Sequence, residues 1–348
     1  MDQPKKLLKF KVQVDKKLAL YLKKKINDAS QHGTITAQLL EQITDFTLRG
    51  GKRVRAALLY YSYLAHGGQE RSKALYASMS MELAESYLLI HDDIMDDDSV
   101  RRGGPTVHKY FEDQQRDKLL GESLAILAGD LAAAYSVDIL LNSGFDQQTI
   151  NSAVKLLNDT YVLECFGQTL DLNTCPIEKM SFDDIMNIPR LKTAPYTFDL
   201  PVKLGAILAG KRMNEVIKLE KYTYPLGIVY QLQDDILSTF GDEKKTGKSS
   251  SSDIKEGKRT LLAYYALKDA NASDQKFLRS VLGNRKASAT DIKKVKEIFE
   301  SSGALAKTQT YAQSLTSSPL DFIDKSNLVG EGKDFLIEIA NIILTRKY

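Results

Sequence analysis

Helical periodicity constrains the fold of this chain more than any other feature of its sequence. Apolar residues recur three and four positions apart in segment after segment, and almost no stretch shows the strict alternation of a half-buried strand. Clusters of glycine, proline, asparagine and serine separate these segments. We therefore predict an all-α protein with helices over residues 74–98, 123–141, 150–172, 201–209, 216–240 and 291–301.

Nothing in the sequence divides the chain into parts. Its 348 residues are 43% hydrophobic, which is enough for a large core, and neither a fixed-period repeat nor a linker rich in proline or glycine interrupts them. We predict a single domain over residues 1–348. The two cysteines, Cys165 and Cys175, have no metal-ligand spacing, which argues against structural zinc and favours a reducing compartment.

Charge and hydropathy limit the partners and the location. A net charge of +3 gives no support for nucleic acid as a partner. No uncharged apolar run reaches about 18 residues and the amino end has no apolar signal region, so we predict a cytoplasmic protein with at most peripheral membrane contact. Either a solvated helix face or contact with an anionic membrane would explain the lysines near the amino end, which are Lys5, Lys6, Lys9, Lys11, Lys16, Lys17, Lys23, Lys24 and Lys25.

The stretch HDDIMDDDSVRRGGPTVH, residues 91–108, places five aspartates at the end of an apolar helical run. Carboxylates at the carboxyl end of a helix face the negative end of its dipole, at a cost of about 0.3–1 kcal/mol each. A cation that the sequence does not supply would remove that cost. On a helix Asp92 and Asp96 share one face, whereas Asp93 lies about 100° round and pairs with Asp97, so spacing alone leaves the functional face open.

A second acidic pair, Asp234 and Asp235, follows another apolar run in YQLQDDILSTF. Magnesium prefers hard oxygen ligands, usually one or two carboxylates together with phosphate and water. Two such clusters on facing helices of a bundle would hold several magnesium ions against one diphosphate. The spacing of an EF-hand calcium loop is absent from residues 92–98.

Basic motifs point to a polyphosphate ligand. The segment GGKRVR, residues 50–55, combines glycines that let a backbone approach closely with cations three apart on one helical face. Such a turn suits a polyphosphate. Further isolated cations either join it or are ordinary surface lysines, and these are Lys192 beside Thr193, Lys248 and Lys258.

These motifs, in this order, resemble those of the trans-isoprenyl diphosphate synthases, the polyprenyl synthetase family. The similarity extends over about residues 40–265. The segments that carry it are GGKRVR (50–55), DDIMD with RRGGPT (92–106), GQTLDL (167–172), LKTAPYTF (191–198), YQLQDD (230–235), GK (247–248) and DIKEGKRT (253–260).

The resemblance implies a single antiparallel helical barrel around a central cavity, usually in a homodimer. Its activity would join isopentenyl diphosphate to an allylic diphosphate, with three magnesium ions when substrate is bound. The implied magnesium ligands are Asp92, Asp93, Asp96, Asp234 and Asp235. The implied ligands of the allylic diphosphate are Arg101, Lys192, Thr193, Gln231 and Lys258, and those of isopentenyl diphosphate are Lys52, Arg55 and Arg102.

Further roles follow from the same resemblance. Gln168 and Asp171 would form a polar pair beneath the reacting carbons, and Lys248 would close over the site. The residues expected to act in catalysis itself are Asp92, Asp96, Arg101, Lys192 and Asp234.

The implied chemistry accounts for these residue types. Diphosphate leaves readily only when its developing negative charge is neutralised, and metals and arginines aimed at it do this electrostatically. The double bond of the second substrate attacks the resulting carbocation, and loss of a proton gives a chain five carbons longer. No nucleophilic side chain is needed, and we predict local packing or hydrogen bonding, rather than base catalysis, for His91 and His108.

Product length is predicted from the residues before Asp92. Tyr87 and Leu88 stand five and four positions earlier, roughly 7.5 and 6 Å away along a helix. Tyr87 would close an apolar product channel there, or else be a core tyrosine. Within the family, this pattern resembles short-chain synthases that make geranylgeranyl diphosphate (C20), with farnesyl diphosphate (C15) as the next expectation.

Two positions depart from the family pattern. Ser238 stands where the second cluster usually has a third aspartate, and Glu85 stands where a histidine or glutamine usually helps to bind isopentenyl diphosphate. Glu85 would either repel that diphosphate or form a structural ion pair with Lys52 or Arg55. The departures leave two rival functions open, a non-catalytic partner subunit of a related synthase and a terpene cyclase.

Overall fold

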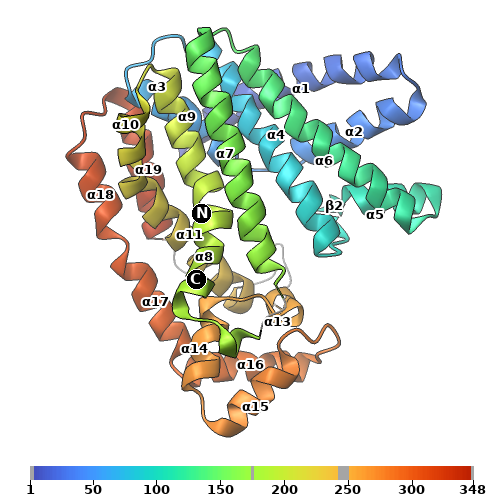
Figure 1. Ribbon diagram of the computed structural model, residues 1–348, viewed down its shortest axis with the longest axis vertical. Coiled ribbons are helices and arrows are strands. Elements are labelled where there is room, and N and C mark those ends of the chain that lie inside the picture. The colour runs from blue at the N-terminus through green and yellow to red at the C-terminus, as the bar shows by residue number, and fades with distance from the viewer. Residues whose placement is uncertain (1–3, 174–175, 242–250, 346–348) are drawn as a thin grey trace. The chain divides into compact units, whose positions relative to one another are not determined.

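The computed structural model describes residues 4–173, 176–241 and 251–345, and these are almost entirely helical (Figure 1). Within this part of the chain the strands are two residues long, β1 (Val100–Arg101) and β2 (Gly104–Pro105), and they pair antiparallel with Arg101 opposite Gly104. The prediction of an all-α fold is confirmed.

The backbone divides into two compact units, each assembled from separate segments. The first unit takes its described residues from Met1–Leu157, Pro201–Met213 and Leu328–Phe335, and the second from Asn158–Leu200, Asn214–Asn327 and Leu336–Tyr348. The chain therefore passes between the units several times. Whether they form one domain, as the sequence predicts, stays a prediction.

The helices of the first unit are α1 (Lys5–Ser30), α2 (Thr34–Leu48), α3 (Val54–Ala65), α4 (Arg71–Met95), α5 (Val107–Gln115), α6 (Lys118–Leu141) and α9 (Leu200–Leu208), joined by the first part of α7 (Gln147–Asp171) and of α19 (Gly330–Leu344). Four of them, α4, α6, α7 and α9, lie close to ranges predicted from periodicity, and no range was predicted for the others.

The second unit contains the remaining elements. Its α-helices are α8 (Phe182–Ile188), α10 (Met213–Val216), α11 (Glu220–Phe240), α13 (Ser252–Glu256), α14 (Leu261–Asp269), α15 (Ala272–Val281), α16 (Ala289–Ser301), α17 (Ala304–Ser314) and α18 (Ser317–Asp324), with the ends of α7 and α19. Short 3₁₀ turns are η1 (Ile177–Lys179) and η4 (Ile217–Leu219), and π-helical turns are η2 (Pro189–Thr193) and η3 (Pro195–Asp199).

Two helices, α3 and α4, are the most deeply buried of the first unit. Every residue from Ala56 to Ala65 of α3 is buried, and so is every residue from Ala77 to Ala84 of α4. Two glycines allow other helices to approach α3. A Cβ at Gly205 of α9 would come within 2.4 Å of the Leu59 carbonyl oxygen, and one at Gly332 of α19 would come within 2.3 Å of backbone atoms of α3.

The end of α4 lies earlier than periodicity predicts. The helix runs beside α6 (Figure 1) and ends at Met95, with Asp96 as its carboxyl cap, instead of continuing to residue 98. Asp97 then adopts a positive φ of 56°, which reverses the chain into the β1–β2 hairpin. Helical spacing counted Asp97 and Asp98 as a further turn because it cannot detect a single left-handed residue.

In the second unit, α11 packs against the segment that contains η2 and η3. The two turns begin at Pro189 and Pro195, and a proline cannot give the N–H that the regular α-helical ladder requires. Gly227 of α11 lies directly against this segment, because a Cβ there would come within 2.5 Å of the Ala194 Cα. The site residues that follow Pro189 are therefore held by the packing of α11.

By length and composition, α6 alone among the helices in the described ranges could cross a membrane. Its most apolar window has a mean hydropathy of 1.8, and 39% of that window is buried. The core helix of a soluble protein meets the same criteria, and α6 also carries Glu122, Asp130 and Asp138. The absence of a membrane span stays a prediction.

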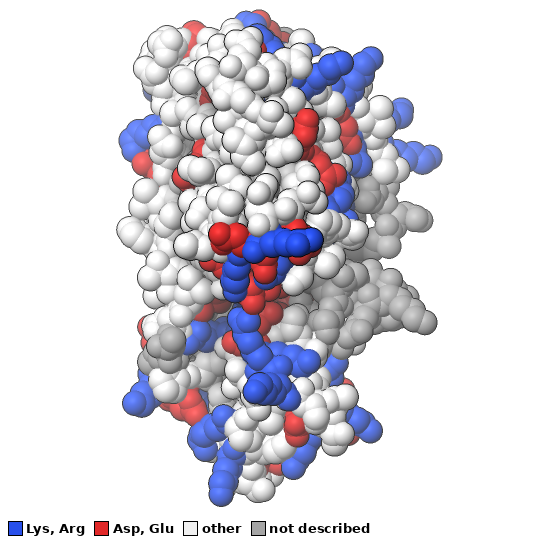
Figure 2. Space-filling view, turned by 90° about the vertical axis from the view of Figure 1, so that its right-hand side faces the viewer, with Lys and Arg blue, Asp and Glu red and all other residues white. Residues whose placement is uncertain are grey.

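Surface charge is mixed in sign. On the face drawn in Figure 2, basic and acidic side chains lie among one another, and a broad area carries neither kind. This mixture agrees with the small net charge of +3.

Candidate active site

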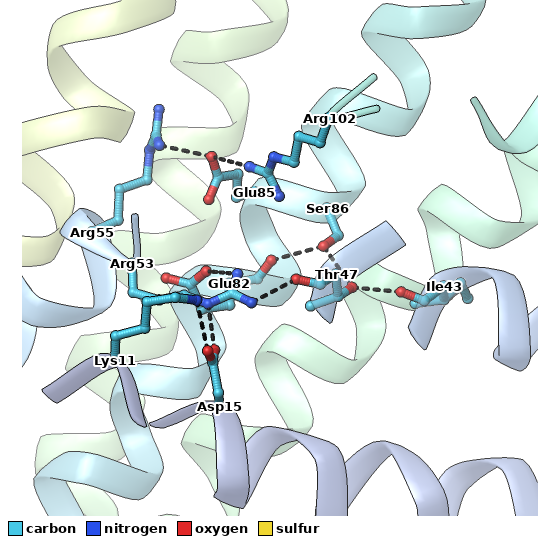
Figure 3. A network of polar contacts seen from close by, with 10 residues as sticks. All are labelled: Lys11, Asp15, Ile43, Thr47, Arg53, Arg55, Glu82, Glu85, Ser86 and Arg102. Atoms are coloured by element: carbon cyan, nitrogen blue, oxygen red, sulfur yellow. Dashed lines mark hydrogen bonds and ion pairs between the residues drawn. The ribbon is translucent and has the colours of Figure 1, made fainter. Parts of the chain in front are cut away.

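The GGKRVR loop is held in place by Arg53, which belongs to the predicted cation motif but is itself buried. Gly50, Gly51 and Arg53 all have positive φ, of 79°, 81° and 59°, and α3 begins at the next residue. The Arg53 side chain, with 2% of its surface exposed, points away from solvent. It donates to Asp15 of α1 (2.6 Å), to Glu82 of α4 (2.7 Å) and to the backbone carbonyl of residue 47 in α2 (2.8 Å), as Figure 3 shows.

Glu82 is the most deeply buried anion of this network. Burial raises the pKa of its carboxyl group, and the neighbouring Arg53 opposes that rise. One carboxylate oxygen, Oε1, has no hydrogen-bond partner among the described residues, whereas Oε2 accepts from Arg53. Loss of Arg53 would leave Glu82 buried without a direct counter-charge, and loss of Glu82 would leave Arg53 buried with Asp15 as its remaining counter-charge.

Glu85, one helical turn after Glu82, joins two of the predicted isopentenyl-diphosphate ligands. Its Oε1 accepts hydrogen bonds from Arg55 (2.9 Å) and from Arg102 (3.0 Å), and Figure 3 shows both guanidinium groups converging on it. These two arginines lower the pKa of Glu85 although burial opposes them. The predicted ion pair between Glu85 and Arg55 is confirmed, and the predicted third cation, Lys52, lies exposed on the loop.

Arg102 also packs on the glycines of the loop. A Cβ at Gly50 would lie 3.5 Å from the Arg102 side chain, and one at Gly51 would lie 3.4 Å from its guanidinium. We predicted that these glycines allow a close approach to the backbone of the loop. In this structure the side chain of Arg102, in the β1–β2 hairpin, makes that approach. Two of the three predicted isopentenyl-diphosphate ligands, Arg55 and Arg102, thus belong to one contact network although they lie on different segments of the chain.

The first acidic cluster separates into an inner and an outer part. Asp93 is fully buried and accepts a hydrogen bond from Arg101, while Asp92 and Asp96 are only partly buried. Burial raises the pKa of Asp93 to about 7, although Arg101 opposes the rise. Arg101 also lies 3.8 Å from Asp92, so it is tied to the cluster that it was predicted to assist.

The histidines of this region have structural roles. His91 Nε2 lies 3.0 Å from the Ile126 carbonyl oxygen of α6, and a Cβ at Gly129 would overlap the His91 ring. His108 is buried, and burial lowers its pKa. Local hydrogen bonding is thus observed for His91 and packing for His108, whose ring nitrogens have no hydrogen-bond partner among the described residues. The absence of base catalysis by either stays a prediction. The Tyr87 ring stands edge-on to His91 at 5.1 Å and is partly exposed.

In the second unit, Asp171 gathers three cations. Its carboxylate accepts from Lys192 (2.8 Å) and lies 4.0 Å from Lys258, both of which were predicted to bind the allylic diphosphate. Arg259 donates to the Asp171 backbone carbonyl at 2.9 Å. Sequence reasoning gave Arg259 no role, although its place in the DIKEGKRT motif beside Lys258 was a signal that could have found it.

A second polar chain runs from Thr193 through Gln231 to Asp235. Thr193 donates to the Gln231 side-chain oxygen (2.7 Å), and the Gln231 amide donates to Asp235 (2.7 Å). Burial and the nearby carboxylates of Asp253 and Asp234 raise the pKa of Asp235 well above its ordinary value. Asp253 was not among the predicted site residues, although it too lies in the DIKEGKRT motif.

Backbone contacts fix the position of Lys192. A Cβ at Gly167 of α7 would come within 2.5 Å of the Lys192 backbone nitrogen, so the glycine of the GQTLDL motif is required by close packing. The next residue, Gln168, is buried. Lys192 is thus placed by its backbone against α7 and by its side chain on Asp171 of the same helix.

Of two residues singled out in the sequence, the structure describes Ser238 but not Lys248. Ser238, which replaces an expected aspartate on α11, is buried with 8% exposure. Lys248, predicted to close over the site, lies outside the described residues.

The first acidic cluster belongs to one unit and the second to the other. Their shared use of metal ions stays a prediction.

The two clusters have the chemistry that a hard divalent cation requires. Across the ranges that the structure describes, no three His, Cys, Asp or Glu side chains gather closely enough to hold a metal ion alone. Magnesium bound through one or two carboxylates, phosphate and water does not need such a group. In each cluster burial raises the pKa of one carboxyl group above its ordinary value, Asp93 in the first and Asp235 in the second. The charged form of these carboxylates is therefore disfavoured, and a bound cation would stabilise it.

Comparison with known proteins assigns the class. The sequence model of the polyprenyl synthetase family matches residues 37–299 of this chain. A short chain isoprenyl diphosphate synthase of Methanocaldococcus jannaschii is 33% identical over 299 residues, which cover 84% of this chain and 83% of that protein. The chain belongs to the polyprenyl synthetase family and is a prenyltransferase.

Further relatives are named for their products, several for geranylgeranyl diphosphate and others, such as that of Aeropyrum pernix, for geranylfarnesyl diphosphate. A geranylgeranyl diphosphate synthase of Saccharolobus solfataricus is 36% identical over 72% of this chain and 73% of its own. Among solved structures, the geranylgeranyl pyrophosphate synthase of Corynebacterium glutamicum, complexed with isoprenyl diphosphate and magnesium, has a TM-score of 0.91 and 30% identity, and the match covers 97% of this chain and 99% of that one.

The Arg53–Glu82 pair predicts a large loss of stability when one partner is removed. Glu82→Ala should lower the free energy of unfolding by about 3 kcal/mol, because Arg53 is left buried with less compensation. The double variant Arg53→Met with Glu82→Leu should recover most of that loss. Urea unfolding measures both, and Asp334→Ala, which breaks an exposed ion pair with Lys6, serves as the control that should change stability by less than about 1 kcal/mol. A loss no larger than the control's would show that the pair does not hold the loop.

Glu85 predicts an effect on one substrate. Glu85→Ala should raise KM for isopentenyl diphosphate about tenfold with little change in kcat, because Arg55 and Arg102 lose the acceptor that orients both. Glu85→Gln, which keeps an acceptor oxygen, should have a smaller effect. Steady-state kinetics at saturating allylic substrate measures this. A lower KM, in a variant with an unaltered melting temperature, would instead support repulsion of the diphosphate by Glu85.

Proposed function

We propose that this prenyltransferase condenses isopentenyl diphosphate with an allylic diphosphate, in a magnesium-dependent reaction through a carbocation, to give a short-chain trans-prenyl diphosphate. The observation that carries the proposal is the presence of two separate cation sets, each gathered beside a carboxylate. Arg55 and Arg102 meet on Glu85. Lys192 binds Asp171, and Lys258 lies 4.0 Å from Asp171 and 3.3 Å from Glu256. A condensation of two diphosphates needs two such sets, whereas a terpene cyclase, which uses one diphosphate, has no evident use for the first.

The chain's own residues would bind and orient the substrates. Arg101, Lys192, Thr193, Gln231 and Lys258 would hold the allylic diphosphate, and Lys52, Arg55 and Arg102 the isopentenyl diphosphate. Both groups are cationic or hydrogen-bonding, and all of their members except the exposed Lys52 are placed by the contacts described above, so little reorganisation of them is needed when an anion binds. Gln168 and Asp171 would lie beneath the reacting carbons.

Magnesium, three ions when substrate is bound, would be held by Asp92, Asp96 and Asp234, with Asp93 and Asp235 beside them, and would neutralise charge on the leaving diphosphate. Arg101 and Lys192 would act on the same developing charge. The departing diphosphate itself is the expected acceptor of the proton lost after bond formation. Nucleophilic side-chain chemistry is not required.

The proposed product is geranylgeranyl diphosphate, with farnesyl diphosphate as the next candidate. The relatives from Saccharolobus solfataricus and Corynebacterium glutamicum are named for the former. Tyr87, on the turn of α4 before Asp92, supports the same length because an aromatic ring there would end an apolar channel after a short chain.

We propose a cytoplasmic homodimer without nucleic acid as a partner. The outward side of α6 supports self-association, since several large apolar side chains are exposed on it, among them Leu119, Ile126 and Leu127. Apolar surface of this kind on one helix marks an interaction site. A second copy of the chain would cover it.

Purified protein with magnesium, labelled isopentenyl diphosphate and each of dimethylallyl, geranyl and farnesyl diphosphate should form a prenyl diphosphate without any added partner. Excess EDTA should abolish turnover. Asp92→Ala should reduce kcat about 100-fold or more, the scale of losing one group that stabilises transition-state charge, and Asp235→Ala should reduce it less, because Asp235 is buried against Gln231.

The rival functions give different results in the same assay. Turnover that requires a related synthase would make this chain a non-catalytic subunit, and a cyclic hydrocarbon product would make it a terpene cyclase. Turnover that survives EDTA would remove the metal from the mechanism. Equal losses for the two aspartate variants would mean that the functional face of the acidic cluster is assigned wrongly.

Tyr87→Ala should give products longer than those of the parent enzyme, because the ring would no longer close the channel. Leu88→Ala, one residue closer to Asp92, is the matched control and should lengthen them less. Chromatography of the dephosphorylated products measures the change. An unaltered profile in a folded, active Tyr87→Ala enzyme would show that the ring is core packing.

A further inference from the structure

The outward face of α1 has an unusual composition. Exposed positions recur on it at helical spacing and form one line of cationic and aliphatic side chains, namely Lys5, Lys9, Val12, Lys16, Leu20 and Lys23. Leu8 and Lys24 flank this line and are exposed as well. We call these eight residues the α1 outer face. It contains no carboxylate.

The lysines of α1 fall into two groups, apart from Lys17, which is half-buried and belongs to neither. Those on the sides of the helix form ion pairs within the first unit, Lys6 with Asp334 at 3.3 Å, Lys11 with Asp15 at 2.6 Å and Lys25 with Asp138 at 3.0 Å.

The lysines of the α1 outer face have no ion pair among the described residues. Pairing thus neutralises the inner cations and leaves five outer ones without a counter-charge. The two carboxylates of α1 form no ion pair with them in the part of the chain that the structure describes, because Asp15 turns inward to Arg53 and Asp28 lies exposed near the carboxyl end of the helix.

The aliphatic side chains of this face are exposed as well. Val12 has 71% of its surface accessible, Leu20 63% and Leu8 47%. A purely solvated helix face gains nothing from such side chains. They are interleaved with the lysines instead of being gathered into an apolar patch, so the face offers charge and hydrocarbon together.

The orientation of this face is fixed. On its inner side α1 buries Leu7, Phe10, Val14, Leu18 and Leu22. The bond from Asp15 to Arg53 also locks the rotation of the helix. From Lys5 to Lys23 the line is about 27 Å long, and all of it lies on one helix whose opposite side is packed in the unit.

We propose that the α1 outer face docks this protein on anionic lipid bilayers. A bilayer interface combines negative headgroups, which attract lysines, with an acyl boundary that accepts aliphatic side chains lying between them. A nucleic-acid backbone would match the lysines but has no place for the aliphatic side chains, and that partner is one outcome of the test.

Physical scale supports reversible docking by this face. Each lysine near an anionic membrane strengthens binding about fivefold, and the attraction falls away within a Debye length of about 8 Å at physiological salt. The aliphatic side chains add a contribution that salt does not screen. Binding should therefore weaken strongly with salt without vanishing.

Cosedimentation of the full chain with vesicles tests the proposal. Vesicles in which about a third of the lipid is phosphatidylglycerol should bind it, and phosphatidylcholine vesicles should not. Replacing Lys5, Lys9, Lys16 and Lys23 together by Gln should weaken binding at least about tenfold. The control replaces four exposed lysines of the second unit by Gln, Lys218, Lys221, Lys276 and Lys286, with the same change in net charge, and should weaken it less than about twofold.

A second variant separates docking from general ion exchange. Val12→Asn with Leu20→Asn keeps the net charge and should still weaken binding severalfold, most visibly at about 0.5 M salt. Melting temperature and turnover with soluble substrates should stay unchanged in all three variants, since none of these residues belongs to the candidate active site.

Three results would overturn the proposal. They are failure of the parent protein to sediment with anionic vesicles, equal losses in the two lysine variants, and parent-like binding of the Asn variant. Tighter binding to a short DNA duplex than to the vesicles at the same salt would also overturn it, in favour of a nucleic-acid partner.

Discussion

The buried charge of Arg53 is the interaction on which the predicted anion site of the first unit depends. A guanidinium with 2% exposure has to be compensated, and Asp15 of α1, Glu82 of α4 and a backbone carbonyl of α2 do this together. Three helices therefore meet on one side chain of the loop between α2 and α3. Of the cations that flank it, Arg55 takes its position from Glu85 of α4, and Lys52 lies exposed on the loop.

A single carboxylate organises the cations in each unit. Like charges placed close enough to bind one diphosphate repel one another. Glu85 relieves that repulsion by accepting from two arginines, and Asp171 relieves it by accepting from Lys192 and lying 4.0 Å from Lys258. Each set is therefore assembled before any substrate arrives. The same carboxylate competes with the incoming anion, so affinity depends on how much of the pairing the diphosphate replaces.

Local sequence pattern predicted the elements well and their long-range pairing poorly. Periodicity placed the helices, and helical spacing correctly put Asp92 and Asp96 on a different side from Asp93, which the structure buries. The sequence could not show that Asp93 binds Arg101, that Asp171 binds Lys192, or that the central arginine of GGKRVR faces inward. These contacts join residues whose separation bears no relation to a helical period, and they follow from packing and from compensation of buried charge.

The contact of Gly167 with the backbone of Lys192 has a consequence for mutational freedom. Every replacement of a glycine adds at least one carbon atom, and at this position the added atom would meet main chain, which cannot rotate away as a side chain can. Position 167 therefore has no conservative alternative. A helix carrying any other residue there would stand farther from the lysine, and the distance between Lys192 and Asp171 would lengthen with it. The position of the Lys192 ammonium group beside Asp171 therefore depends on a glycine at position 167.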